Sequence, residues 1–131
     1  MNEQELHALI TYRLNRAEET LVEARLMQKE EHWNTCANRL YYAAFYAVSA
    51  LLLKEGYVAT KHTGIKSMFN QHFVKTAVIS KENGRLYNRL FNLRQEGDYV
   101  DFVSFEAVTI QPLIEETAVF IDKIRSLLTQ E

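Results

Sequence analysis

One segment, Asn34–Lys54, constrains the fold more than any other because it is apolar almost all round. It reads NTCANRLYYAAFYAVSALLLK, and its main stripe recurs at helical spacing through Ala37, Leu40, Tyr41, Ala44, Val48, Leu51 and Leu52. Asn34 or Thr35 can cap the start of this helix, and Gly56 can end it in the left-handed conformation. A helix with so many apolar sides must be covered on those sides. We therefore expect a central helix surrounded by others.

Helical periodicity also marks four further segments. We expect helices over Glu3–Lys29, Thr63–Val74, Gly84–Glu96 and Ser104–Leu128. Gly97 should end the fourth helix of the chain, and Pro112 should kink the last helix or mark its real start. The 131 residues include only four Gly and one Pro, too few for many strands and tight turns. The fold class is thus predicted to be all-α: an up-and-down antiparallel bundle of four to five helices, forming one domain over residues 1–131.

The composition is that of a soluble globular protein, with 47% hydrophobic and 24% charged residues. No apolar run approaches the roughly 18 residues of a membrane span, so we expect a cytoplasmic protein with no membrane partner. The lone Cys36 fits a reducing compartment. Three aromatic residues beside the main apolar stripe, Tyr42, Phe45 and Tyr46, predict a second contact surface, and homodimerisation is the simplest explanation for it.

Charge is distributed unevenly along the chain. Residues 54–94 carry eight Lys or Arg against two Asp or Glu, a net of +6, whereas residues 95–131 carry two against eight, a net of −6. A basic middle segment is consistent with a phosphate-bearing partner. The alternative is that the two segments are neighbours in the fold and neutralise each other.

Three groups of polar residues are candidates for chemistry. Arg39, beside Asn38 in the most apolar helix, needs a partner, which is either an acid from another helix or a bound anion. Lys61 and His62 precede a helix whose first backbone N–H groups could hold a phosphate, although the pair could equally be a solvated loop. The four histidines and Cys36 are not at metal-ligand spacing, so we expect no metal site and no cofactor.

The third group is the stretch RQEGDY, from Arg94 to Tyr99. On a continuous helix, Arg94 and Tyr99 would point roughly 140° apart. If Gly97 breaks the helix, the chain can fold Asp98 and Tyr99 back beside Arg94. The result would be either an Arg–Asp cap with a buried tyrosine or an anion site.

Three stretches together resemble the HEPN family of small helical domains: NRLYYAAFYAVSALLL, KHTGIKSMFNQHFVKT and LRQEGDYVD. The resemblance covers about residues 10 to 128 and is greatest to a stand-alone subgroup whose last motif ends in Asp-Tyr. It implies an antiparallel helical bundle that dimerises and binds a nucleotide or RNA in a cleft at the dimer interface. Family members often act beside a small nucleotidyltransferase in toxin–antitoxin or defence modules.

Many members of the family are metal-independent ribonucleases that use an arginine followed four to six residues later by a histidine. Arg94 matches the arginine, but Tyr99 occupies the histidine position. A phenol with a pKa near 10 is a poor base at neutral pH, although it can hydrogen-bond a phosphate or stack on a base. His62 is a candidate replacement for the missing imidazole.

The leading hypothesis from the sequence is a nucleotide- or RNA-binding domain with weak or no catalysis. Its positive charge would come from Arg39, Lys61 and Arg94, and Asn38, Asp98 and Tyr99 would orient the ligand or the arginines. The second hypothesis is a ribonuclease that uses Arg94 with Tyr99 or His62. The third is a protein–protein interaction module in which these polar residues are structural.

Overall fold

The computed structural model describes residues 1–129, and that range contains five α-helices and no strand. The helices are α1 (Glu3–Lys29), α2 (Trp33–Lys54), α3 (His62–Phe69), α4 (Lys81–Tyr99) and α5 (Ala107–Thr129), with a π-helical turn over Asn70–Val74. The prediction of an all-α fold is confirmed. None of the helices in the described range is both long and apolar enough to cross a membrane.

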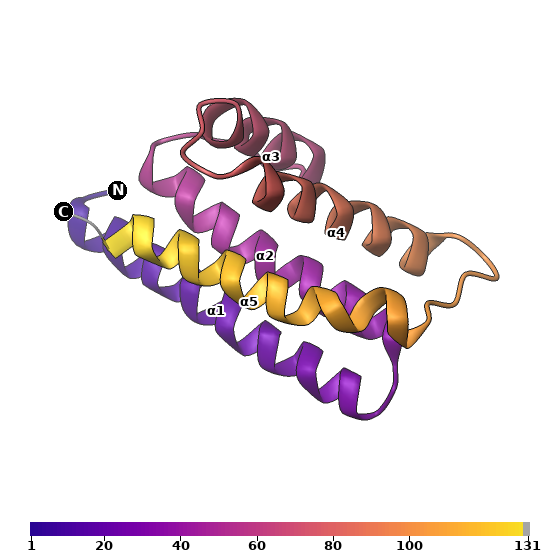
Figure 1. The fold of residues 1–131 in the computed structure, drawn as a ribbon. Helices are drawn as coiled ribbons and strands as arrows, with labels where there is room; N and C mark the ends of the chain where they lie inside the picture. Colours follow the sequence, from indigo (N-terminus) through magenta and orange to yellow (C-terminus); the bar gives the residue numbers. More distant parts are fainter. Residues whose placement is uncertain (130–131) are drawn as a thin grey trace.

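The most apolar helix, α2, lies at the centre of the bundle as predicted. In Figure 1, α1 and α5 lie on one side of α2, α4 lies on the other, and α3 crosses one end. Helix α2 contacts each of these four helices. Leu40 and Tyr41 are fully buried. So are five small residues that let neighbouring backbones approach closely: Ala37, Ala43, Ala44, Ala47 and Ala50. Burying a leucine completely stabilises the fold by about 2 kcal/mol.

The start of α2 differs from the prediction. The helix begins at Trp33, and no side chain caps it. The Asn34 side chain instead holds the loop between α4 and α5: its Nδ2 donates to the Val103 carbonyl oxygen at 2.9 Å, and its Oδ1 accepts from the Phe105 backbone N–H at 2.8 Å. At the other end of the helix, Gly56 has a φ of 78°, as expected for a left-handed helix end.

Helix α4 is longer than predicted at both ends. Ser80 caps its start by accepting a hydrogen bond from the Asn83 backbone N–H at 3.1 Å. The helix continues through Gly97 to Tyr99, so the prediction that Gly97 ends it was wrong. Gly97 serves close packing instead, because a Cβ atom there would lie 2.9 Å from Cε2 of Phe105. The loop that Asn34 holds therefore packs directly against the last turn of α4.

The last helix begins at Ala107, so Ser104 does not cap it, and Pro112 lies inside it. A proline within a helix leaves the carbonyl oxygen four residues earlier without its usual donor. That residue is Val108, which is exposed, so water can satisfy the carbonyl. The predicted third helix, Thr63–Val74, is divided into α3 and the π-helical turn.

The three aromatic residues predicted to form a second contact surface are half-buried within this chain. Tyr42, Phe45 and Tyr46 all pack against the core. The His62 ring centre lies 4.6 Å from that of Phe45, and the Arg16 guanidinium carbon lies 5.1 Å from that of Tyr46. Polar side chains of the same chain thus cover much of this surface.

Candidate functional site

The Arg94 side chain extends from α4 onto an aromatic surface formed mainly by α2. Its Nη2 donates hydrogen bonds to the hydroxyls of Tyr42 and Tyr99, both at 3.0 Å. Its guanidinium carbon lies 5.7 Å from the ring centre of Tyr41, 5.4 Å from that of Tyr42 and 5.1 Å from that of Tyr99. Only 11% of the side chain is exposed, so these rings hold a largely desolvated cation in one orientation.

Arg94 and Tyr99 meet although α4 does not break between them. The long arginine side chain and the position of Tyr99 in the last turn bring the two groups together within one helix. The predicted proximity of Arg94, Asp98 and Tyr99 is therefore present, but the hinge at Gly97 that was expected to produce it is not. The alternative of an Arg–Asp cap with a buried tyrosine does not hold for Tyr99, because this residue is 67% exposed.

One carboxylate, Asp98, faces the Arg94 guanidinium. Its Oδ2 lies 3.2 Å from Nε of Arg94 and accepts a hydrogen bond from Nδ2 of Asn38 at 2.8 Å. The Nε contact is ionic, since this buried nitrogen makes no directional hydrogen bond. Among residues 1–129, Nη1 of Arg94 also has no acceptor. Arg94 is thus fixed by three neighbours and still has donors for an anion.

His62 joins the same aromatic surface from the start of α3. Its Nδ1 is hydrogen-bonded to the Tyr41 hydroxyl at 2.7 Å, and its ring centre lies 5.7 Å from that of Tyr42. Nε2 is therefore the ring nitrogen left for a ligand, as donor or acceptor according to the tautomer. Because Arg94 and His62 both contact Tyr41 and Tyr42, the structure brings together two residues 32 positions apart in the sequence.

The electrostatics of this arrangement favour neutral rings around Arg94. Burial raises the pKa of the Tyr41 hydroxyl to about 12, so it stays protonated at neutral pH. Burial, followed by the nearby charge of Arg94, lowers the pKa of His62 below its ordinary value of 6.5. Both effects favour the neutral imidazole, and its Nε2 can accept a proton in the tautomer whose Nδ1 donates to the Tyr41 hydroxyl oxygen. The side chains gathered here form the Arg94 site: Asn38, Tyr41, Tyr42, His62, Arg94, Asp98 and Tyr99.

Arg39 has the structural partner that was one of its two predicted alternatives. Its Nη1 donates to Glu23 of α1 at 3.0 Å, and its Nε and Nη2 donate to Oδ1 of Asn38 at 3.0 and 2.8 Å. Its guanidinium carbon also lies 5.3 Å from the Tyr42 ring centre. Arg39 borders the Arg94 site and orients Asn38, but its own charge is balanced by Glu23. Lys61, just before α3, is exposed and makes no side-chain cap.

Three contributors were missed in the sequence. Tyr41 and Tyr42 were assigned only to the core and its border, yet they form the surface that aligns Arg94 and His62. Lys66 was not singled out, although its Nζ lies 4.2 Å from the ring centre of Phe91, one helical turn before Arg94. The adjacent tyrosines in the most apolar helix, and the four-residue spacing of His62 and Lys66, were the available signals.

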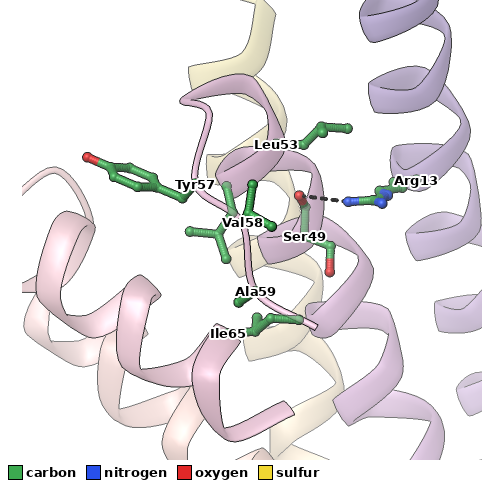
Figure 2. A pocket seen from close by; sticks show the side chains of 8 residues that line it. Arg13, Ser49, Leu53, Tyr57, Val58, Ala59 and Ile65 are labelled. Carbon is green, nitrogen blue, oxygen red and sulfur yellow. Dashed lines mark hydrogen bonds between the residues drawn. The ribbon is translucent and has the colours of Figure 1, made fainter. Parts of the chain in front are cut away.

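A separate pocket lies away from the Arg94 site, between α1, α2 and the start of α3. Figure 2 shows Arg13 reaching across from α1, where its Nη1 donates to the Ser49 carbonyl oxygen at 3.2 Å. Most of the other lining side chains are apolar, including Leu53, Val58 and Ile65. None of the predicted site residues lines this pocket. Residues 1–129 also contain no group of three or more His, Cys, Asp or Glu side chains arranged to hold a metal ion.

The chain matches one known domain family and is similar to several known proteins along most of its length. The chain matches the HEPN domain family over residues 10–127. It is 44% identical to a UPF0332 protein of Thermotoga maritima over 128 residues, covering 98% of this chain and 96% of that protein. It is 32% identical to a protein of Methanocaldococcus jannaschii named "Putative toxin MJ0605", covering 97% of this chain and 91% of that protein. A second protein of that archaeon, "Putative toxin MJ0142", is 29% identical, with coverages of 88% and 78%.

The proximity of Arg94 and His62 predicts how His62 titrates. Its pKa, measured by NMR of the ring nitrogens, should lie below 6.5, and it should rise in Arg94→Met because one source of the depression is removed. Arg89→Met removes an exposed cation elsewhere on α4 and should leave the pKa unchanged. Because the unfolded state binds this proton more tightly, the contribution of His62 to stability should be lost as pH falls below about 6.5. A pKa at or above 6.5 in the native protein would contradict this geometry.

Proposed function

This chain belongs to the HEPN domain family, and on that premise we propose that it binds the phosphate of a nucleotide or RNA at the Arg94 site. The observation that carries the proposal is the state of the Arg94 guanidinium. It is held on three tyrosine rings and nearly desolvated, yet Nη1 has no acceptor in the described part of the chain. A positioned arginine with unused donors suits a phosphate oxygen.

The side chains around Arg94 provide the remaining parts of such a site. Asp98, itself held by Asn38, pairs with Nε of the guanidinium, and the Tyr99 hydroxyl accepts a hydrogen bond from Nη2. The exposed ring of Tyr99 is available to stack on a base. Lys61 and the uncapped N–H groups at the start of α3 lie next to His62 and favour an anion there.

The distribution of ion pairs supports an anionic ligand. Among residues 1–129, only one ion pair joins the basic middle segment to the acidic end of the chain, and it is Arg94–Asp98. Acids of α5 pair elsewhere, as in Glu115 with Arg25 of α1. Direct pairing therefore does not neutralise the basic segment, and its positive field remains to attract phosphates.

Binding should depend on the planar arginine and not on charge alone. Arg94→Lys keeps the positive charge but loses the fork of donors, so the affinity for a short single-stranded RNA should fall by about ten- to a hundredfold. Arg89→Lys is the matched control on the exposed face of α4 and should bind like the native chain. Isothermal calorimetry and fluorescence anisotropy at several salt concentrations would measure both variants.

If Arg94→Lys lowers the melting temperature while RNA affinity is the same in all three proteins, the site is structural. The interaction-module hypothesis would then be preferred. If the native chain shows neither salt-dependent RNA binding nor heat on titration with ATP, the proposal is rejected altogether.

The wider setting that we propose is a homodimer in a two-gene module with a nucleotidyltransferase, of toxin–antitoxin or defence type. Family membership supports it, as do the relatives that are named as toxins. Exposed apolar side chains just after α4, from Val100 and Phe102, offer a contact surface beside the site. Sedimentation equilibrium tests the dimer, and the adjacent open reading frame tests the partner.

A second candidate function, a metal-independent ribonuclease, is favoured by one observation: a neutral imidazole lies beside Arg94 although the family's usual histidine position holds Tyr99. In this reaction, His62 takes the proton of a ribose 2′-hydroxyl, and the 2′-oxygen attacks the adjacent phosphorus. Arg94 stabilises the negative charge on the phosphoryl oxygens. The bond to the 5′-oxygen breaks, and that oxygen receives the proton.

The ribonuclease candidate makes a prediction that binding does not. His62→Gln should abolish cleavage of a single-stranded RNA while reducing its affinity by less than about threefold, since the amide retains polar contacts. His72→Gln, on the turn after α3, is the control and should cleave normally. Cleavage should also increase with pH through the lowered pKa of His62. RNA that stays intact under saturating native protein would exclude this function while leaving the binding proposal in place.

A further inference from the structure

Lys66 is a half-buried cation that the Arg94 site does not account for. It lies four residues after His62, so the two side chains share one face of α3 and are separated by about 6 Å along the helix axis. Its Nζ lies 4.2 Å from the centre of the Phe91 ring. Lys66 forms no ion pair with any acidic residue of the described range. An ammonium group is thus held between α3 and α4 without a counterion.

The same ring connects Lys66 to the Arg94 site. The Phe91 ring centre lies 5.9 Å from that of Tyr41, and the Arg94 guanidinium carbon lies 5.7 Å from the Tyr41 ring centre. Phe91 also precedes Arg94 by three residues, so both project from neighbouring turns of α4. Lys66 and Arg94 therefore stand on one continuous aromatic surface, with His62 beside them.

A purely structural role explains part of this arrangement. The methylene stem of Lys66 can cover Phe91, which is 6% exposed, and a cation over an aromatic face is favourable in itself. Neither the covering of Phe91 nor the cation–aromatic contact requires Lys66 to share a helix face with His62. Neither requires it to lie near Arg94, whose charge is only partly paired. Two such cations on one surface repel each other and are best stabilised together by a ligand carrying two negative charges.

From these contacts we propose that Lys66 forms a second phosphate subsite, which binds the phosphate next to the one held by Arg94. The ligand is then a single strand of RNA with at least two successive phosphodiester groups. A nucleoside diphosphate fits less well, because its two phosphorus atoms share one bridging oxygen, whereas Lys66 and Arg94 lie over two different rings, Phe91 and Tyr41, whose centres are 5.9 Å apart. This inference rests on the proposed function and adds to it the length and class of the ligand.

The test compares two RNA analogues that differ by one nucleotide and therefore by one phosphodiester, and the Lys66 variants separate the effect of the added phosphate from that of the added base. Uridine dinucleotide and trinucleotide with 2′-fluoro substitution carry one and two phosphodiesters, and neither can be cleaved through a 2′-hydroxyl. NMR titration of the native chain should give a several-fold higher affinity for the trinucleotide. In Lys66→Met, which keeps the apolar stem, this gain should be lost, and the affinity for the dinucleotide should be unchanged. Lys66→Arg should restore the gain.

The controls separate this inference from the proposed function. Lys75→Met removes an exposed cation from the same part of the chain and should keep the full gain. A gain that persists in Lys66→Met, equal losses for both analogues, or a Lys66-dependent affinity for ADP equal to that for the trinucleotide would each overturn the second subsite. Failure of the native chain to bind either analogue would instead overturn the proposed function, and the subsite with it.

Discussion

The structure depends on the need to cover α2 on all sides. This helix is too apolar to face water, and α1, α4 and α5 pack along it while α3 closes one end. Its fully buried alanines bring these neighbours close to its backbone. At Tyr41 and Tyr42, however, the apolar surface is covered by Arg94 and His62 and not by aliphatic side chains. The candidate site thus lies where two basic side chains, Arg94 and His62, cover part of the surface of the central helix.

The surroundings of these two groups keep Arg94 charged and His62 neutral, although both lie against Tyr41 and Tyr42. The positive charge of Arg94 is costly to bury, and Asp98 and the faces of three tyrosine rings reduce that cost. The same charge, together with burial, keeps His62 neutral. A fixed cation beside a neutral imidazole is the arrangement that the ribonuclease candidate would use. The loop held by Asn34 packs Phe105 on Gly97 and thereby supports the turn that carries Asp98 and Tyr99.

Much of the fold could be predicted because helical periodicity is a local property. The bounds of α1 and the central position of α2 follow from spacing and composition alone. The errors arose where a long-range contact decides what a residue does. Gly97 looked like a helix stop, but it is small because Phe105 packs against it. Asn34 looked like a cap, but it bonds a loop some seventy residues away.

The candidate site was predicted less completely for the same reason. The sequence places Arg94, Asp98 and Tyr99 near one another, and it raises His62 as a replacement base. It cannot show that Tyr41 and Tyr42 align Arg94 with His62, because three different helices meet there. It also left open whether Arg39 meets an acid or a ligand, which Glu23 of α1 decides. Lys66 reaches the site only through Phe91 of another helix, a contact that no local sequence pattern indicates.

The central claim is that an RNA phosphate binds on the aromatic surface between α2, α3 and α4. Chemical-shift mapping of the labelled protein with a non-cleavable single-stranded RNA tests it most directly. The largest shifts should occur at Tyr42, His62 and Arg94, with little change around Arg13 and Val58 in the separate pocket of Figure 2. Shifts concentrated in that pocket, with the Arg94 site unperturbed at saturation, would contradict it.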